Sequence, residues 1–178
     1  MSEYAQDFVR HLEQLRERDR GALAALRHSL AFAPGGYPPA YPYVERFVAG
    51  ERHAQDAWRL ALYVVAGLYA LHPKHGASSV AASLGLLMRE RGSASIEKRF
   101  VALLGADAEN LPNYLRQIVS LLAAGDRSFD YAALLGDLSR WLNPRLDPDW
   151  RDQIRQCWAR DFYRAVEKPV IDQSKTSN

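Results

Sequence analysis

The chain has 178 residues, 48% of them hydrophobic and 25% charged, and a formal net charge of +2. This length fits one domain with a sizeable core, and the single cysteine, Cys157, excludes a disulfide-stapled secreted scaffold. The longest apolar run, residues 60–71, is shorter than the roughly 20 residues that cross a bilayer, and the first residues carry no export signal. We therefore expect a soluble, cytoplasmic protein with no membrane partner.

The N-terminal part predicts two helices followed by a loop. Apolar residues at helical spacing predict a first helix over residues 3–19. Asp19 ends it and caps a second helix, which carries leucines on one face. Residues 33–42 contain four prolines and two glycines, which predicts a non-helical loop. Two interpretations stay open for its tyrosines, Tyr37 and Tyr41: they pin the loop to the body of the protein, or they stack on bases.

Six further helices are predicted, each from an apolar stripe and a start or stop signal. The first of them is apolar on nearly every side, which marks it as the central helix. Serine, aspartate and proline residues mark the starts of most of the others. The expected segments are 54–71, 79–91 with Ser79 as cap, 95–104 with Ser95 as cap, 112–124, 131–142 with Asp130 as cap, and 147–166.

These segments predict an all-α fold of about eight helices, in two bundle-like halves that share a core. No alternation of Val and Ile indicates a strand. A weak seam at residues 92–94 divides the chain into an N-terminal half, residues 1–92, and a C-terminal half, residues 93–178. The polar tail after Pro169 is expected to fray.

No group of residues predicts catalysis, a metal site or a cofactor. The glycines form no phosphate-binding loop, and one cysteine cannot supply a zinc-binding thiolate pair. His72 and His75 stand three apart, but in a turn that contains Pro73 and lacks a nearby carboxylate. Cys157 falls on the apolar face predicted for the last helix, so we expect a buried, inert thiol. The chain is therefore predicted not to be an enzyme.

Asp161 is the exceptional residue of that last helix. At 100° per residue, it falls inside the apolar arc of Trp150, Ile154, Cys157 and Ala165. A buried carboxylate is costly unless it is paired. We expect an ion pair or a hydrogen bond to the backbone of another helix; the alternative interpretation is a catalytic acid.

The basic residues favour a phosphate-binding surface. Four lysines leave nineteen arginines among the 23 basic residues, and the planar arginine fork suits phosphate, although codon usage is an equal explanation of the ratio. Several of these residues fall on or beside polar helix faces, where convergence on one face would form a phosphate track. The predicted nucleic-acid-binding residues are Arg20, Arg27, Lys98, Arg99, Arg116 and Arg140.

The order and spacing of several amphipathic stretches resemble a known family. They span residues 5–166, and none is diagnostic alone. The stretches are 19–27, 95–104, 111–119, 137–141 and 158–163. Together they resemble the CasB family, the small subunit of the type I-E CRISPR surveillance complex called Cascade.

The resemblance implies an all-helical, non-catalytic subunit, present as two copies along the inner side of the complex. It implies binding to the backbones of single-stranded DNA and guide RNA, with the displaced DNA strand held while guide RNA pairs with its target. The implied partner subunits are CasA, CasC, CasD and CasE. The low net charge means that any phosphate track is local. Phosphate contacts do not distinguish DNA from RNA, and the competing hypothesis is a structural adaptor whose arginines contact only protein.

Overall fold

The computed structural model describes residues 3–48, 50 and 53–167. Within these ranges the fold is all-α with no strand, as predicted; the lone β pairing there is a bridge between His75 and Phe129. Three short 3₁₀ turns lie at Ser29–Ala31, Pro38–Ala40 and Glu45–Phe47. The α-helices are α1 (Glu3–Arg18), α2 (Arg20–His28), α3 (Tyr41–Val44), α4 (Ala57–Leu71), α5 (Val80–Arg91), α6 (Ala94–Leu104), α7 (Leu111–Ala124), α8 (Tyr131–Trp141) and α9 (Pro148–Glu167).

Side-chain caps begin several of these helices where the sequence predicts them. The carboxylate of Asp19 accepts a hydrogen bond of 2.9 Å from the Ala22 amide, and that of Asp130 accepts one of 2.9 Å from Ala133. Each cap satisfies an amide that has no partner inside its helix. The corner between α1 and α2 and the start of α8 are therefore set by local chemistry.

The starts of α4 and α6 differ from the prediction. The side chain of Asp56 accepts hydrogen bonds from the amides of Trp58 and Arg59, so α4 begins at Ala57 rather than at residue 54. Helix α6 begins one residue after Ser93, which places Ser95 in the first turn rather than at the cap. Neighbouring Ser residues offer two possible starts, and the chain uses the first.

The proline-rich loop is more helical than predicted. Pro38 starts a 3₁₀ turn and α3 follows at Tyr41, because proline is compatible with the first turn of a helix. This short helix is the additional one beyond the predicted eight. The Tyr41 hydroxyl donates a hydrogen bond of 2.9 Å to the Gly35 carbonyl, and its ring packs edge-on against Tyr63. Tyr41 thus pins the loop to the body.

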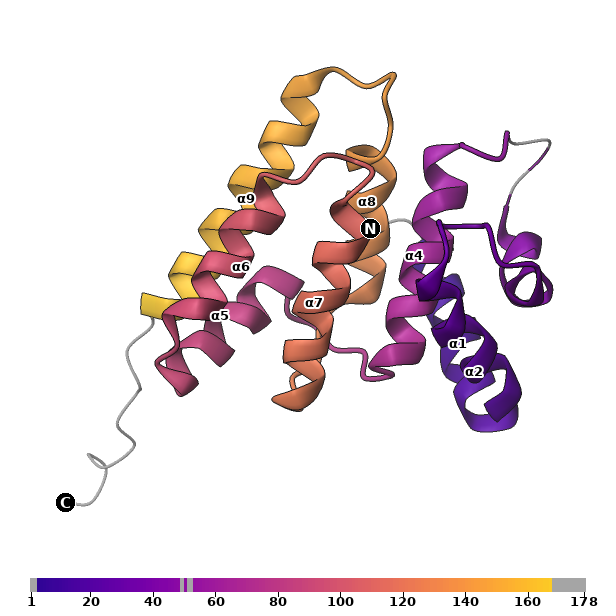
Figure 1. Cartoon of the computed structure of the whole chain (residues 1–178), viewed down its shortest axis with the longest axis horizontal. Coiled ribbons are helices and arrows are strands. Elements are labelled where there is room, and N and C mark those ends of the chain that lie inside the picture. Colours follow the sequence, from indigo (N-terminus) through magenta and orange to yellow (C-terminus); the bar gives the residue numbers. More distant parts are fainter. Residues whose placement is uncertain (1–2, 49, 51–52, 168–178) are drawn as a thin grey trace.

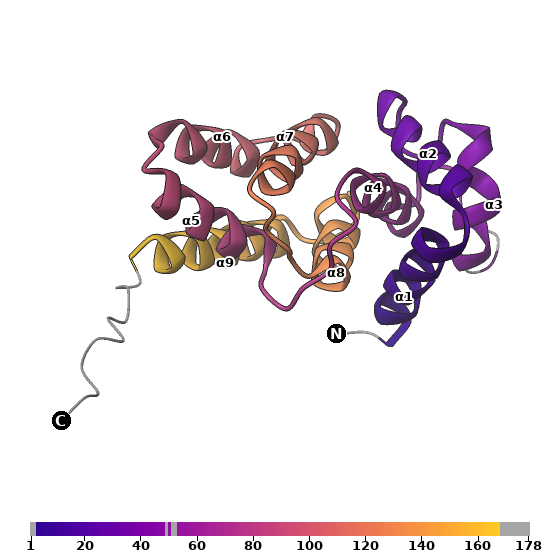
Figure 2. The ribbon, with the colours of Figure 1, turned by 90° about the horizontal axis from the view of Figure 1, so that it is seen from below.

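Helix α4 lies at the centre of the molecule, with α2, α7 and α8 packed around it (Figures 1 and 2). Leu62, Val65 and Leu68 are fully buried on it, as expected for the helix predicted to be central. Away from this centre, α5 packs along α9, and α6 packs against α7. The division into residues 1–92 and 93–178 stays a proposal, and the pairings α4 with α8 and α5 with α9 both cross it.

Glycines permit two close approaches between helical segments. A Cβ on Gly67 of α4 would lie 2.6 Å from the Leu30 side chain, and one on Gly85 of α5 would lie 2.4 Å from the Phe162 carbonyl oxygen. Both distances are shorter than the van der Waals contact of a Cβ atom, so a larger residue at either position would force these segments apart. The absence of a side chain therefore decides how closely the segment after α2 packs on α4 and how closely α5 packs on α9.

The orientation of α9 differs from the apolar face that the sequence predicted for this helix. Its buried face is made by Ile154, Trp158 and Phe162, whereas Cys157 and Trp150 are exposed. Large rings occupy the interface: Trp158 packs on Trp141, and Phe162 stacks on Phe100 with ring centroids 4.2 Å apart. Burying these rings turns Cys157 toward solvent, so the prediction of a buried thiol is wrong.

Asp161 lies at the edge of that buried face and is half-buried. Its carboxylate accepts a hydrogen bond from the Ser79 hydroxyl. The partner is therefore outside α9, as expected, but it is a side-chain hydroxyl rather than a cation or a backbone group.

Candidate nucleic-acid interface

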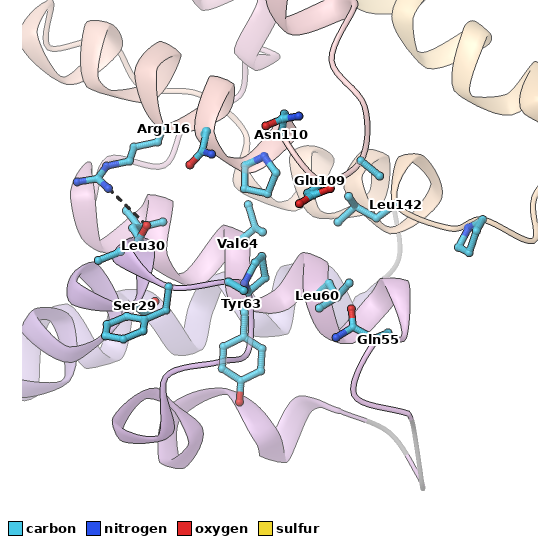
Figure 3. A pocket seen from close by; sticks show the side chains of 18 residues that line it. Ser29, Leu30, Gln55, Leu60, Tyr63, Val64, Glu109, Asn110, Arg116 and Leu142 are labelled. Atoms are coloured by element: carbon cyan, nitrogen blue, oxygen red, sulfur yellow. Dashed lines mark hydrogen bonds between the residues drawn. The ribbon is translucent and has the colours of Figure 1, made fainter.

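A groove separates the segment after α2 from the start of α7. It encloses about 700 Å³. Leu60, Tyr63 and Val64 of α4 line it between residues 29–34 on one side and residues 108–116 on the other (Figure 3). Its lining is largely apolar, with polar groups supplied mainly by the α7 side.

A smaller hollow of about 320 Å³ adjoins this groove. Arg27 and His28 of α2 line it together with Arg116 of α7, and both hollows share Ala31 and Arg116. Arg116 donates a hydrogen bond of 3.4 Å from Nη1 to the carbonyl of Leu30, across the gap between the two sides (Figure 3). Arg27 and Arg116 therefore meet at the mouth of the groove.

All six predicted binding residues are exposed, and they lie on four helices. Arg20 lies about two turns before Arg27 on α2, which places both on the same helix face. Lys98 and Arg99 lie on α6, which packs beside α7. Arg140 lies in the last turn of α8, which packs against α4.

Four other arginines are committed to carboxylates. Arg10 pairs with Asp7, Arg59 with Glu45, Arg127 with Glu90 and Arg155 with Asp152. In contrast, none of the six predicted residues forms an ion pair within the described ranges. Apart from the hydrogen bond of Arg116 to the Leu30 carbonyl, these side chains are therefore available to an external anion.

The interior of the groove is less suited to phosphate than its mouth. Glu109 lines the groove and carries a negative charge that repels an anion there. Arg27 and Arg116 lie at the mouth, where the smaller hollow begins. An anionic backbone is thus favoured along the outer edge rather than inside.

An aromatic cluster beside this mouth was missed by the sequence analysis. It consists of His28, Phe32 and Tyr37, and Phe32 is 46% exposed although it is a large apolar residue. The available signal was the spacing of His28 and Phe32, four residues apart directly after Arg27, followed by an aromatic residue in the proline-rich loop. Of the three residues in this cluster, only Tyr37 was predicted as a candidate for base stacking.

The histidine pair has structural partners. His72 lies with Nε2 2.7 Å from the Arg127 carbonyl oxygen, and the Nδ1 of His75 accepts from the amide of Tyr131 at 3.3 Å. The described part of the chain contains no cluster of three or more His, Cys, Asp or Glu residues able to hold a metal ion. None of its helices has both the length and the hydrophobicity to cross a membrane.

Within the described residues the protein is all-helical, with a surface groove and two arginines at its mouth. The family model of the CRISPR-associated protein Cse2 matches residues 22–163. The chain therefore belongs to the Cse2 family, also called CasB, and the resemblance seen in the sequence is confirmed.

Relatives of known structure share the whole fold. The chain is 46% identical over 146 residues to the Cse2 protein of Thermus thermophilus, covering 81% of this chain and 79% of the relative. The crystal structure of CasB from T. thermophilus matches with a TM-score of 0.75 and 40% identity, covering 92% of this chain and 99% of that one. A chain of a structure described as a CRISPR RNA-guided surveillance complex matches with a TM-score of 0.76 and 24% identity, covering 92% and 94%.

Proposed function

We propose that this protein is a non-catalytic subunit of a CRISPR RNA-guided surveillance complex that acts in the cytoplasm. It binds the sugar–phosphate backbone of single-stranded nucleic acid without reading sequence. The family membership supports this assignment, as does the fold shared with a chain of such a complex. We further propose that two copies work beside CasA, CasC, CasD and CasE, contact the guide RNA backbone and hold the displaced DNA strand.

The meeting of Arg27 and Arg116 carries the nucleic-acid part of the proposal. The two residues come from α2 and α7 and line one hollow, free of carboxylate partners in the described ranges. Guanidinium groups suit phosphate oxygens because they donate several hydrogen bonds in one plane. We expect Arg20 on α2 and Lys98 and Arg99 on α6 to add further phosphate contacts, and Arg140 on α8 to add another.

The test is the salt dependence of binding to a single-stranded oligonucleotide. Each phosphate neutralised contributes a slope of about −0.7 in log K against log salt for single strands. Replacing both Arg27 and Arg116 by Gln should weaken binding to unrelated sequences alike and reduce the slope by about 1.4. Fluorescence anisotropy titrations at several salt concentrations measure both quantities.

A matched control removes the same charge elsewhere. Arg10→Gln combined with Arg155→Gln removes two arginines that are already paired with Asp7 and Asp152. This control should keep the slope of the parent. An unchanged slope for the Arg27 and Arg116 variant would overturn the phosphate contact.

The adaptor function remains the second candidate because apolar side chains are exposed on α6 and α9. Val101 is 53% exposed and Tyr163 is 39% exposed, and the Tyr163 hydroxyl donates a hydrogen bond of 3.0 Å to Glu97, one turn before Val101. Such a surface fits a protein partner. If the arginines contact only protein, the Arg27 and Arg116 variant binds DNA like the parent but fails to join the partner subunits in a reconstitution assay.

A further inference from the structure

The aromatic cluster of His28, Phe32 and Tyr37 has the geometry of a stacking platform. The rings of Phe32 and Tyr37 are stacked, with centroids 4.8 Å apart and planes inclined by 22°. His28 packs against both, at 5.7 Å from Phe32 and 5.1 Å from Tyr37. Tyr37 covers one side of the Phe32 ring, yet the residue is 46% exposed. The ring therefore retains surface on which another planar group can stack.

The backbone that carries the platform is held in place. The Phe32 amide donates a hydrogen bond of 3.0 Å to the Ser29 carbonyl, and the Gly36 amide donates one of 2.8 Å to Ala33. Gly35 adopts a φ of +74°, and a Cβ there would lie 2.2 Å from a guanidinium nitrogen of Arg59, so a larger residue would strain the backbone and displace Arg59. A surface fixed before binding costs little conformational entropy when a ligand arrives.

Charge identifies the ligand that this platform fits. Arg27 directly precedes His28, and Arg116 lines the same hollow as both. Exposed rings beside unpaired arginines match a polymer that alternates planar groups with anions, which is the pattern of single-stranded nucleic acid. A protein partner with aromatic and acidic residues lacks this regular alternation of planar groups and anions.

We propose that Phe32, supported by Tyr37 and His28, stacks on a nucleobase of the strand whose phosphates contact Arg27 and Arg116. This inference rests on the proposed function and adds a base contact to it. Stacking is tolerant of sequence because every base has a flat face. The platform thus positions the strand at the mouth of the groove without selecting a sequence.

The test compares two strands that differ only in their bases. The probes are an oligodeoxythymidine and an abasic deoxyribose-phosphate oligomer of the same length, titrated against the full chain at low salt. Phe32→Leu keeps an apolar side chain of similar size but removes the ring. It should weaken binding to oligodeoxythymidine about tenfold, leave binding to the abasic strand unchanged, and preserve the salt slope.

Two further variants sharpen the comparison. Trp150→Leu removes an aromatic residue on α9 that is 47% exposed, and it should leave binding to both strands unchanged. Phe32→Trp restores a planar ring and should retain the parent affinity. A strand with a single 2-aminopurine should lose fluorescence on the parent and less on Phe32→Leu, since stacking on an aromatic ring quenches this base.

The outcomes separate the two proposals. Equal weakening of both strands by Phe32→Leu would overturn the stacking contact, and so would unchanged binding of oligodeoxythymidine, which would leave the platform to a protein partner. A parent protein that binds the abasic strand with a steep salt dependence keeps the proposed function even if stacking fails. A parent that binds neither strand would overturn both.

Discussion

The hydroxyl of Ser79 donates a hydrogen bond of 2.6 Å to the carboxylate of Asp161, across 82 residues of sequence. The same hydroxyl accepts a hydrogen bond from the Ala82 amide and so caps α5. One side chain therefore joins the start of α5 to α9, the helix that packs along it. The close approach at Gly85 and this polar contact hold the same pair of helices.

Replacing Asp161 should test the strength of this contact. We expect Asp161→Ala to lower the free energy of unfolding by about 1–3 kcal/mol, because it leaves the half-buried Ser79 hydroxyl without its acceptor. Ser79→Ala should cost about 1–2 kcal/mol, since it removes the cap as well. Gln156→Ala, at an exposed position of the same helix as Asp161, is the control.

A double-mutant cycle tests whether Asp161 and Ser79 interact. It compares the free energies of unfolding in urea of the parent, both single variants and the double variant. If Asp161 and Ser79 interact, the double variant should lose less stability than the sum of the two single losses. Strict additivity would show that the two residues contribute independently.

A network of Glu45, Arg59 and Tyr63 predicts a second loss of stability. Arg59 donates from Nη2 and Nε to one carboxylate oxygen of Glu45, at 2.6 and 3.0 Å, and the Tyr63 hydroxyl donates to the same atom at 2.6 Å. The Arg59 side chain is only 11% exposed. Glu45→Gln should therefore cost about 1–3 kcal/mol, because it leaves a largely buried cation without its counter-charge.

Burial raises the pKa of Tyr63 in this network, and the hydrogen bond with Glu45 raises this pKa further. Glu17→Gln, at an exposed position of α1, is the control for loss of one carboxylate. Equal denaturation midpoints for Glu45→Gln and its control would contradict the role of the network.

Asp137 predicts a pH dependence of stability. Burial raises the pKa of this carboxyl above its usual 3.8, while the hydrogen bond from the Trp158 indole, at 2.7 Å, and the charge of Arg140 oppose the rise. Between 3.8 and the raised value, the folded state holds a proton that the unfolded chain has released. Stability from this group is therefore present at low pH and is lost as the pH rises through that window.

Asp137→Asn keeps an oxygen that accepts from Trp158 but carries no charge. We expect it to be more stable than the parent at about pH 7, with the difference disappearing toward about pH 3. Thermal unfolding of both proteins across this range measures the effect. A constant difference at every pH would show that Asp137 does not titrate in the folded state.

His11 predicts a dependence of the opposite sign. Burial lowers the pKa of His11 below 6.5, and Arg46 also lowers it, against the hydrogen bond with the Tyr43 carbonyl, where Nε2 lies at 2.8 Å. The unfolded chain therefore takes up a proton first as the pH falls, and the folded state loses stability below pH 6.5. His11→Gln should flatten the decline of the denaturation midpoint between about pH 7 and pH 5.

Exposed His53 supplies the comparison for that measurement. His53→Gln should leave the decline as steep as in the parent. A decline that stays steep in His11→Gln would assign the pH dependence to another group.

The position of Arg140 outside the hollow lined by Arg27 and Arg116 predicts additivity in binding. Arg27 and Arg116 line one hollow, so their effects on nucleic-acid affinity should be coupled, whereas Arg140 lies on α8 and does not line this hollow. Substitutions at distant sites add in free energy and those at adjacent sites do not. Arg140→Gln should therefore add its full effect to the Arg27 and Arg116 variant, and a non-additive result would place the three arginines on one continuous contact.

The sequence by itself determined the helices, because their signals are local. Asp19, Ser79 and Asp130 cap helices by bonding amides three residues ahead, and apolar residues at helical spacing mark the buried stripes. These contacts lie within a few residues of chain, so the pattern of residues suffices to predict them. The family resemblance followed from the same ordered stripes.

Only the tertiary structure decided which faces meet. The orientation of α9 depends on Trp158 and Phe162 packing against Trp141 and Phe100 on other helices, and that packing exposes Cys157. The meeting of Arg27 with Arg116 across the groove likewise depends on how α2 and α7 pack around α4. Helical periodicity predicts which face of a helix is buried, but not which other helix packs against that face. Close packing between segments distant in sequence decides this, and it also decides which residues form the candidate site.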